Sequence, residues 1–281
     1  MRVLIFADME GISSIVTLAE TGTKDGWWEK ARVIMTNEVN SAIEGAVKAG
    51  ATQIDVIDWH AEGANILPDK LHPEASLLRG LSLPVFLGSL VGKNTHDAAF
   101  IIGIHSRYDT PHGILAHTMN GVVRTEINGE PVGEVQLISA LCSSWNIPVV
   151  LISGDKAAID EANKYIPDAE TVITKEGTIW TGARCFHPDK VCTQIEEKAK
   201  KSLKNLKNPE FYTLGETLNV TMSFKGRCDH TFAGDYAALI PTVTRVDGTT
   251  ITFTCSSVID YFRMLVVITS VVRQAYAEIM Q

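Results

Sequence analysis

The chain has 281 residues, of which 45% are hydrophobic and 21% charged. This balance is typical of a folded globular protein and argues against extensive disorder. The formal net charge of −8 argues against a general nucleic-acid binder, because an acidic surface repels phosphate groups.

Targeting and redox features of the sequence favour a cytoplasmic protein without a membrane partner. The first twelve residues carry no pattern of a cleaved signal peptide,. The most apolar run near the C-terminus, residues 264–272, is far shorter than the ~20 residues that span a bilayer. The five cysteines include no CxxC motif, so we expect reduced thiols rather than a disulfide framework or a thiolate zinc site.

The first 175 residues alternate between short apolar runs and segments with helical periodicity. The apolar runs predict strands at 2–8, 53–59, 83–88, 97–105, 122–127 and 148–155,. The periodic segments predict helices at 27–50, 132–146 and 156–166,. This alternation favours an α/β fold with a mostly parallel sheet covered by helices on both faces.

The last hundred residues have a different character and predict an α+β extension. A charged amphipathic helix is expected at 187–206 and an apolar closing helix at 258–280,. Between them, strands are expected at 218–225 and 242–255, the latter folded into a hairpin at Asp247-Gly248,. We therefore expect a catalytic domain over 1–180 and a C-terminal part over 181–281, with a soft boundary that also allows one continuous domain.

Acidic and imidazole side chains follow three of the predicted strands. Asp8 and Glu10 follow the first strand, His60 the second and His105 a later one, while Glu134 lies in the first turn of a helix. Because the carboxyl ends of parallel strands form the functional edge of such a sheet, we expect these side chains to meet there. Carboxylate and imidazole ligands suit zinc, manganese, iron or cobalt.

The spacing of Asp8 and Glu10 fits a site for two metal ions, although each residue has another interpretation. Residues two apart in an extended stretch point to the same side. One carboxylate can then bridge two ions that lie ~3.5–4 Å apart. Taken singly, an acidic residue after a strand is often a helix N-cap, and a histidine there is often structural. The shared pattern at three strand ends strengthens the metal site, but from the residues alone the structural interpretation stays open beside it.

A further histidine, His117, follows the His105 strand by a few residues and is expected at the same edge. It could serve as general base, nucleophile or transition-state donor, because imidazole titrates near neutral pH; the alternative is a structural loop histidine. Arg107 could bind a substrate carboxylate or form a surface ion pair. Motifs of phosphate-binding loops, α/β-hydrolases, zincins and dinucleotide-binding folds are absent,.

Five sequence blocks taken together resemble the D-aminopeptidase family of zinc peptidases. They are DMEGI at 8–12, DWH at 58–60, GIHSR at 103–107, AHTM at 116–119 and NGEPVGE at 128–134. The resemblance implies a two-zinc enzyme that removes N-terminal D-amino acids, D-alanine above all, from short peptides. It also implies a ring-shaped homo-oligomer, such as a decamer.

The resemblance also assigns roles to individual residues. His117 falls on the histidine proposed as the catalytic nucleophile, and Asp8 on the position that bridges two zinc ions. The residues at the zinc-ligand positions are Asp8, Glu10, His60, His105 and Glu134. Thr118 stands where the family commonly has serine, and Asn120-Gly121 also departs from its pattern, which bears on substrate preference.

Three alternatives remain open from the sequence. The chain could be another metal-dependent amidohydrolase, a phosphoester hydrolase on the same scaffold, or a non-catalytic metal- or ligand-binding subunit. A phosphoester site would favour several Lys or Arg residues near the metals, whereas only Arg107 is close in sequence.

Overall fold

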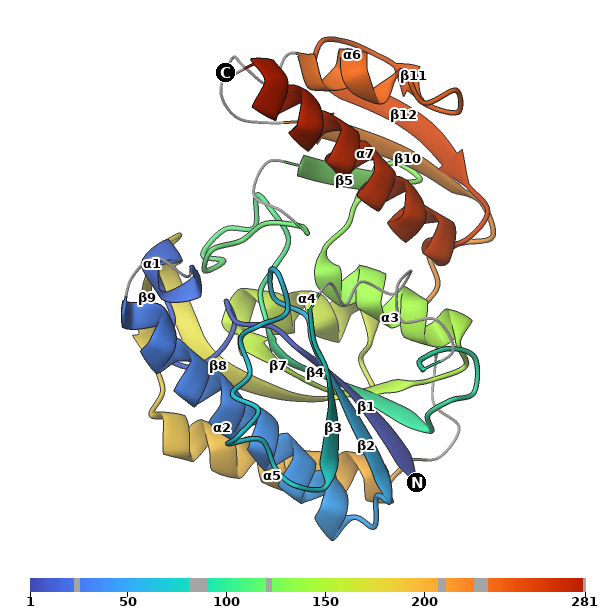
Figure 1. The fold of residues 1–281 in the computed structure, drawn as a ribbon. Helices are drawn as coiled ribbons and strands as arrows, with labels where there is room; N and C mark the ends of the chain where they lie inside the picture. Colours follow the sequence, from blue (N-terminus) through green and yellow to red (C-terminus); the bar gives the residue numbers. More distant parts are fainter. Residues whose placement is uncertain (23–25, 81–89, 120–122, 207–210, 225–231, 280–281) are drawn as a thin grey trace. The chain divides into compact units, whose positions relative to one another are not determined.

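A computed structural model describes residues 1–22, 26–80, 90–119, 123–206, 211–224 and 232–279 (Figure 1). The chain forms two compact units, and the first comprises residues 1–116 and 134–213. The second unit comprises residues 117–133 and 214–281. The boundary expected near residue 180 therefore lies inside the first unit. The reason is packing, because helix α5 (Pro188–Lys204) buries Val191 and Ile195 in the same apolar core as helix α2 (Gly26–Lys48).

A seven-stranded sheet runs through the first unit in the order β3-β2-β1-β4-β7-β8-β9. All neighbouring strands are parallel except β8 and β9, which form an antiparallel pair. The predicted mostly parallel sheet is confirmed. The strands are β1 (Arg2–Ala7), β2 (Gln53–Asp58), β3 (Ala75–Leu78), β4 (Ala98–Ile104), β7 (Val149–Asp155), β8 (Glu170–Ile179) and β9 (Gly182–Cys185).

Helices cover both faces of this sheet (Figure 1). Helices α2 and α5 pack together on one face, and α3 (Glu134–Ser144) and α4 (Lys156–Tyr165) lie on the other. A short helix, α1 (Leu18–Thr21), precedes α2. Double coverage explains why β4 is buried along its whole length and reads as a continuous apolar run in the sequence,. The helical periodicity of residues 27–50 would place Val33 on the apolar face of α2, but its side chain is 47% exposed.

The order of strands reverses around β1, which pairs with β2 on one side and β4 on the other. In open α/β sheets, ligands bind beyond the carboxyl ends of the strands at such a reversal point. The chain continues to pair with β4 just beyond β1, since the Asp8 amide donates to the Ile102 carbonyl at 2.9 Å and the Gly11 amide to the Gly103 carbonyl at 2.7 Å. Residues 8–11 therefore lie at this point.

The second unit is built on an antiparallel sheet in the order β11-β12-β10-β5-β6. Helix α7 (Val258–Ile279) contributes the buried side chains Tyr261 and Phe262, and α6 (Ala233–Ala237) is short. The hairpin expected around Asp247-Gly248 is present as β11 and β12. The strands are β5 (Val123–Ile127), β6 (Glu130–Pro131), β10 (Leu218–Phe224), β11 (Thr244–Arg245) and β12 (Thr250–Cys255).

The observed strands differ in part from those expected from the sequence. The strand expected at 122–127 exists as β5, but it belongs to the antiparallel sheet because it pairs with β10. The sequence did not predict β3, β8 or β9; β3 pairs with β2 at the sheet edge, and β8 pairs with β7. The strand expected at 83–88 falls outside the described residues. None of the helices in the described part of the chain has the length and apolarity that a bilayer crossing requires.

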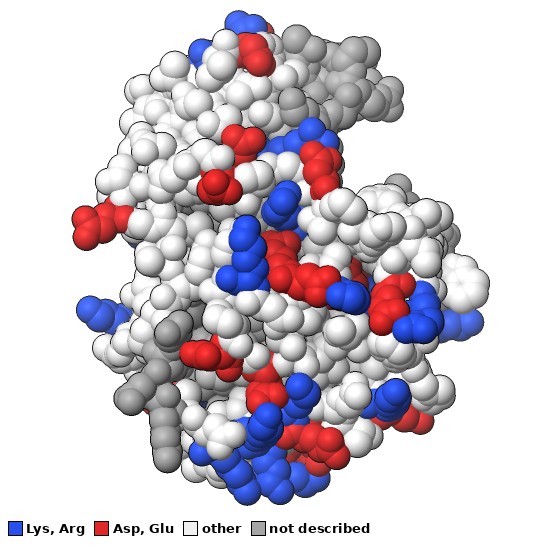
Figure 2. All heavy atoms as spheres, turned by 180° about the vertical axis from the view of Figure 1, so that it is seen from behind, with Lys and Arg blue, Asp and Glu red and all other residues white. Residues whose placement is uncertain are grey.

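The charges on the face seen in Figure 2 are interspersed, with acidic and basic side chains next to each other. Ion pairs between surface residues include Lys156 with Asp160 at 2.7 Å and Lys198 with Glu170 at 3.1 Å. Such pairing keeps the local field from taking a single sign.

Candidate metal centre

The structure brings all five predicted ligands together in the first unit. Asp8 and Glu10 follow β1, His60 follows β2 and His105 follows β4, so three strand ends converge as expected. Glu134 does not follow a strand of this sheet; it is the first residue of helix α3. Each of the five residues is at most 8% exposed. Burial of this many ionisable groups is costly unless they pair or coordinate a metal.

The five side chains form two pairs that share Asp8. In the Glu10–His60 pair, Glu10 Oε2 lies 2.9 Å from His60 Nδ1. In the Glu134–His105 pair, Glu134 Oε1 lies 3.2 Å from His105 Nε2. Asp8 directs Oδ1 to His60 Nδ1 at 3.4 Å and Oδ2 to His105 Nε2 at 3.6 Å. Each carboxylate oxygen of Asp8 thus faces a different imidazole.

Main-chain carbonyls fix the orientation of both imidazoles. His60 Nε2 lies 2.9 Å from the Thr21 carbonyl, and His105 Nδ1 lies 2.8 Å from the Ser106 carbonyl. A carbonyl oxygen only accepts, so these nitrogens carry the hydrogen in each ring. The opposite nitrogens, which face the carboxylates, are then the ones whose lone pairs can bind a metal. Histidine ligands are usually held in this way by a hydrogen bond from the second nitrogen.

The charges in the cluster shift one another's protonation. Burial by itself lowers the pKa of His60, but the charges of Glu10 and Asp8 outweigh it, so the pKa stands well above its usual value. The pKa of His105 is raised in the same way, with Glu134 outweighing burial. Burial raises the pKa of Asp8 to about 7, and the charge of Glu10 adds to the effect. The cluster therefore retains positive charge, either as protons or as a metal.

The donor set fits a metal centre by its chemistry and its burial. Ligand atoms of Asp8, Glu10 and His105 all lie within 4.8 Å of one another. Asp8 Oδ2 is buried and has no hydrogen-bond donor among the described residues. Carboxylate oxygens and imidazole nitrogens are the ligands that bind zinc in proteins. The chemistry of these residues therefore fits zinc.

Two side chains that sequence reasoning assigned no role support the ligands. Trp59 Nε1 donates to Glu134 Oε2 at 2.7 Å, which orients the carboxylate whose other oxygen faces His105. Lys175 is fully buried in β8 and donates to the Glu10 carbonyl at 2.5 Å. Trp59 stands inside the DWH block, whereas nothing in the sequence singles out Lys175, because β8 mixes buried, half-buried and exposed residues.

The two other candidate site residues, His117 and Arg107, have different surroundings. His117 is the first residue of the second unit and is half-buried. It directly follows Ala116, whose carbonyl accepts a 3.4 Å bond from Trp180 Nε1 within the first unit. The catalytic role of His117 stays a prediction. The amide of Arg107 donates to Glu161 Oε2 at 3.1 Å, and its guanidinium donates to the Tyr108 carbonyl at 3.1 Å.

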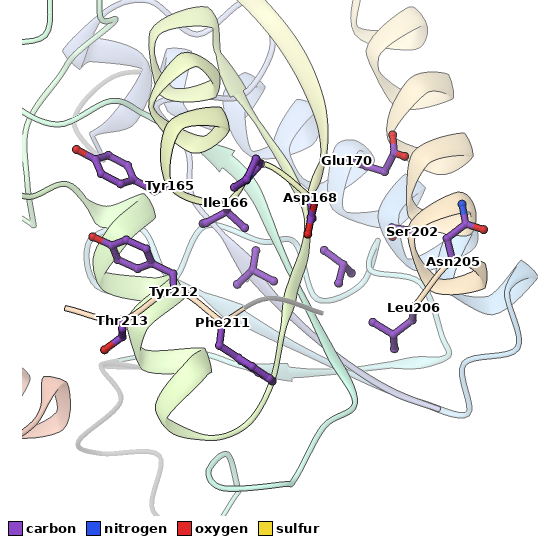
Figure 3. A pocket seen from close by; sticks show the side chains of 13 residues that line it. Tyr165, Ile166, Asp168, Glu170, Ser202, Asn205, Leu206, Phe211, Tyr212 and Thr213 are labelled. Carbon is purple, nitrogen blue, oxygen red and sulfur yellow. The ribbon is translucent and has the colours of Figure 1, made fainter. Parts of the chain in front are cut away.

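A cavity of about 570 Å³ lies at the opposite edge of the same sheet (Figure 3). It is lined by the start of β7 at Val149, the start of β8 at Glu170, and the ends of α4 and α5. Tyr165 and Tyr212 form one wall, with ring centroids 5.6 Å apart. Glu170 is already paired with Lys198 and Lys201. None of the predicted site residues lines this cavity.

Comparisons with known proteins agree with this geometry. A D-aminopeptidase from Bacillus subtilis (strain 168) is 30% identical over 273 residues, covering 96% of this chain and 97% of its own length. The solved structure of the Zn-dependent D-aminopeptidase DppA from Bacillus subtilis, a self-compartmentalizing protease, matches with a TM-score of 0.88 and 28% identity, covering 97% of this chain and 98% of its own. The profile of the D-aminopeptidase family matches residues 1–267. The chain therefore belongs to the D-aminopeptidase family, a family of hydrolases.

Proposed function

We propose that the chain is a zinc-dependent aminopeptidase that removes an N-terminal D-amino acid, such as D-alanine, from short peptides. The observation that carries the proposal is the position of Asp8, whose two carboxylate oxygens face His60 and His105 separately. A shared carboxylate of this kind supports two zinc ions per chain. Membership of the family supports the choice of zinc and the aminopeptidase reaction.

The residues of the chain prepare the site for an amide substrate. Glu10 and His60 would hold one ion, Glu134 and His105 the other, and Asp8 both. When bound, zinc polarises a carbonyl and lowers the pKa of a coordinated water to ~7. Trp59, Thr21 and Ser106 keep the ligands in their binding orientation, so little reorganisation is needed on binding.

The disposition of nearby cations supports an amide rather than a phosphoester substrate. A phosphoester site presents Lys or Arg side chains to the phosphate oxygens. Here the ammonium of Lys175 donates to the carbonyls of Glu10 and Ile12. The guanidinium of Arg107 donates to the Tyr108 carbonyl. Both cations are thus engaged by main-chain oxygens.

We assign the catalytic role to His117, as nucleophile, general base or donor to the developing oxyanion. Replacing it by alanine is expected to lower kcat by about 10²–10⁴-fold, while the zinc content of the protein stays unchanged. A variant His117→Ala with normal kcat would remove this assignment. Loss of zinc from the variant would instead make His117 a ligand.

We also propose a homo-oligomer in the cytoplasm. The relative DppA is a self-compartmentalizing protease, which supports assembly of this chain into a ring such as a decamer. Cys142, Cys185, Cys192 and Cys255 are not in disulfides, which supports a reducing compartment. Light scattering of the purified protein measures the assembly, and a monomer at micromolar concentration would contradict it.

The decisive experiment measures zinc per chain and stereospecific hydrolysis on the same preparation. Protein purified without chelators is expected to contain about two zinc ions per chain and to hydrolyse dipeptides with N-terminal D-alanine faster than their L-counterparts. Chelation should abolish the activity and zinc should restore it. If the protein retains no zinc after zinc is added and the excess is removed, the metal centre is refuted. If it retains zinc but prefers L-peptides, only the proposed stereospecificity is refuted.

A further inference from the structure

The loop that carries Glu10 is held by side chains from outside the metal centre. Three consecutive carbonyls of this loop, those of Glu10, Gly11 and Ile12, accept hydrogen bonds from β8. Lys175 Nζ donates to Glu10 at 2.5 Å and to Ile12 at 2.6 Å. Thr174 Oγ1 donates to Gly11 at 2.5 Å. The main chain from Glu10 to Ile12 is thus held from one strand.

An irregularity in β8 allows two adjacent side chains to face the same loop. Side chains of neighbouring residues in a regular strand point to opposite faces. Here Gly154 of β7 pairs with Ile173, and Asp155 pairs with Lys175, so Thr174 is an extra residue on β8. Such a bulge re-aims the side chains beside it. Thr174 and Lys175 can therefore both reach the loop.

The loop has no room to retreat from β8. The Gly11 amide donates to the Gly103 carbonyl at 2.7 Å. A Cβ atom at Gly11 would lie 2.0 Å from the Ile104 carbonyl oxygen, so only glycine fits there. The loop is confined between β4 on one side and the donors of β8 on the other. Its position, and that of the Glu10 side chain, is determined by these contacts.

The ammonium of Lys175 is costly to place where it is. Lys175 is fully buried, and burial of a charge carries a large desolvation penalty. Its hydrogen bonds go to main-chain oxygens of the loop that carries Glu10. The charges of the buried residues Asp155 and Glu38 offset part of the penalty, but the donors of the ammonium are directed at the loop.

We propose that Lys175 is a positioning residue for the metal centre, because its ammonium holds the carbonyls of Glu10 and Ile12 and thereby keeps the Glu10 carboxylate beside His60. The inference rests on the proposed metal function. Glu10 Oε2 lies 2.9 Å from His60 Nδ1, and this separation depends on where the loop backbone is held. Lys175 acts through Glu10 and does not contact the substrate.

The test compares zinc binding by two variants of adjacent residues. Lys175→Met keeps most of the length of the side chain but removes the ammonium that donates to the carbonyls of Glu10 and Ile12. Its zinc affinity is expected to fall about 10–100-fold, the usual effect of losing a group that orients a ligand. Thr174→Val is the matched control, because it removes a donor from the same strand to the same loop but only from Gly11. It should change the zinc affinity much less.

Zinc affinity is measured by competition with a chromophoric chelator, on full-length protein whose near-ultraviolet circular dichroism shows a folded state. Lys175→Arg retains a cationic donor and should restore part of the affinity. If Lys175→Met does not fold, Lys175→Gln replaces it with the same expectation, because its amide is shorter and reaches at most one carbonyl. A structural role alone would not distinguish Lys175 from Thr174.

Folded Lys175→Met with wild-type zinc affinity would overturn the inference, as would an equal loss of affinity in Thr174→Val. These results differ from a failure of the proposed function. If the wild-type chain binds no zinc, the metal centre itself is refuted. If the wild type binds zinc and Lys175→Met binds it equally well, only the positioning role is lost.

Discussion

The two edges of the parallel sheet in the first unit differ in what they bury. The carboxyl edge holds five ionisable side chains, each at most 8% exposed, that lie close to one another. The amino edge holds a cavity of about 570 Å³ with aromatic walls, and its Glu170 is paired with surface lysines (Figure 3). A cavity of this size does not by itself mark a reactive site. Ionisable groups forced together away from water mark the carboxyl edge as the reactive one.

The directions of the helices reinforce this difference. Helices on a parallel sheet run opposite to the strands, so their amino ends lie at the carboxyl edge. Glu134 occupies the first turn of α3, and Asp155 caps α4 by accepting from the Ala158 amide at 2.7 Å. Carboxylates are stabilised at such positions by the helix dipole. The last turn of α5, at the other edge, carries Lys201 and Lys204.

The strongest test of the contrast is Asp8→Ala. Asp8 faces both imidazoles of the metal centre, so its loss should abolish binding of both ions and reduce hydrolysis to background. Elemental analysis measures the zinc content per chain. The matched change at the amino edge, Glu170→Ala, should leave zinc content and activity unchanged. If Asp8→Ala retained two ions, Asp8 would not be shared.

Trp59→Phe sharpens the comparison within the carboxyl edge. It removes the 2.7 Å bond to Glu134 Oε2 but keeps an aromatic ring against Phe6, whose ring centroid lies 5.5 Å from that of Trp59. Zinc affinity should fall about tenfold or more, because the Glu134 carboxylate loses its orienting donor. Chelator competition measures this, and unchanged affinity would show that α3 alone orients Glu134.

Ile166→Ala tests the amino edge. Ile166 is 7% exposed and lines the cavity, so truncation should lower the free energy of unfolding by about 2 kcal/mol or more. Denaturant unfolding measures the loss. The value of kcat/KM should stay within about twofold of wild type, because a core truncation remote from the site changes no transition-state contact. A large fall in kcat/KM would show that the cavity affects the metal centre, contrary to this expectation.

Glu38→Gln makes the smallest expected change, in the pH dependence of stability. Glu38 is fully buried, faces Ser13 and Lys175, and has a pKa that burial raises to about 7. An unfolded glutamate loses its proton near pH ~4.3, so the wild type loses stability as pH rises from there to about 7,. The Tm of Glu38→Gln relative to wild type should therefore increase by roughly a few °C between pH 5 and 8. Thermal unfolding of both metal-free proteins measures it, and a constant difference would contradict the pKa.

The convergence of the candidate ligands could be predicted because most of them follow strand ends. Asp8, His60 and His105 are found by one rule, that chemistry gathers at the carboxyl ends of parallel strands. Local patterns also place the helices α2, α3 and α4 within a few residues of their observed ends. Glu134 lies at a helix start, where the turn before it marks the boundary.

The features that could not be predicted from the sequence depend on contacts between residues that lie far apart in the chain. The apolar run at 122–127 gives no sign that it pairs with β10, about a hundred residues later, rather than joining the parallel sheet. The role of Lys175 depends on contacts with residues 10 and 12. The burial of Glu38 can be inferred from the sequence, because this residue shares a helical face with Met35, Val39 and Ala42, which are all buried,. An acidic residue on an apolar helix face signals a buried polar contact.

The extra residue in β8, Thr174, makes the sheet less regular but helps β8 to hold the loop that carries Glu10. Deleting Thr174 would let Lys175 follow Ile173 directly and restore an unbroken ladder with β7, in which Ile173 already pairs with Gly154 and Lys175 with Asp155. The shortened strand would lose the hydrogen bond from Thr174 to the Gly11 carbonyl, together with the bulge that lets two adjacent side chains face the loop,. A one-residue deletion here thus trades a more regular sheet for a less firmly held loop, so the length of β8 is constrained as well as its composition.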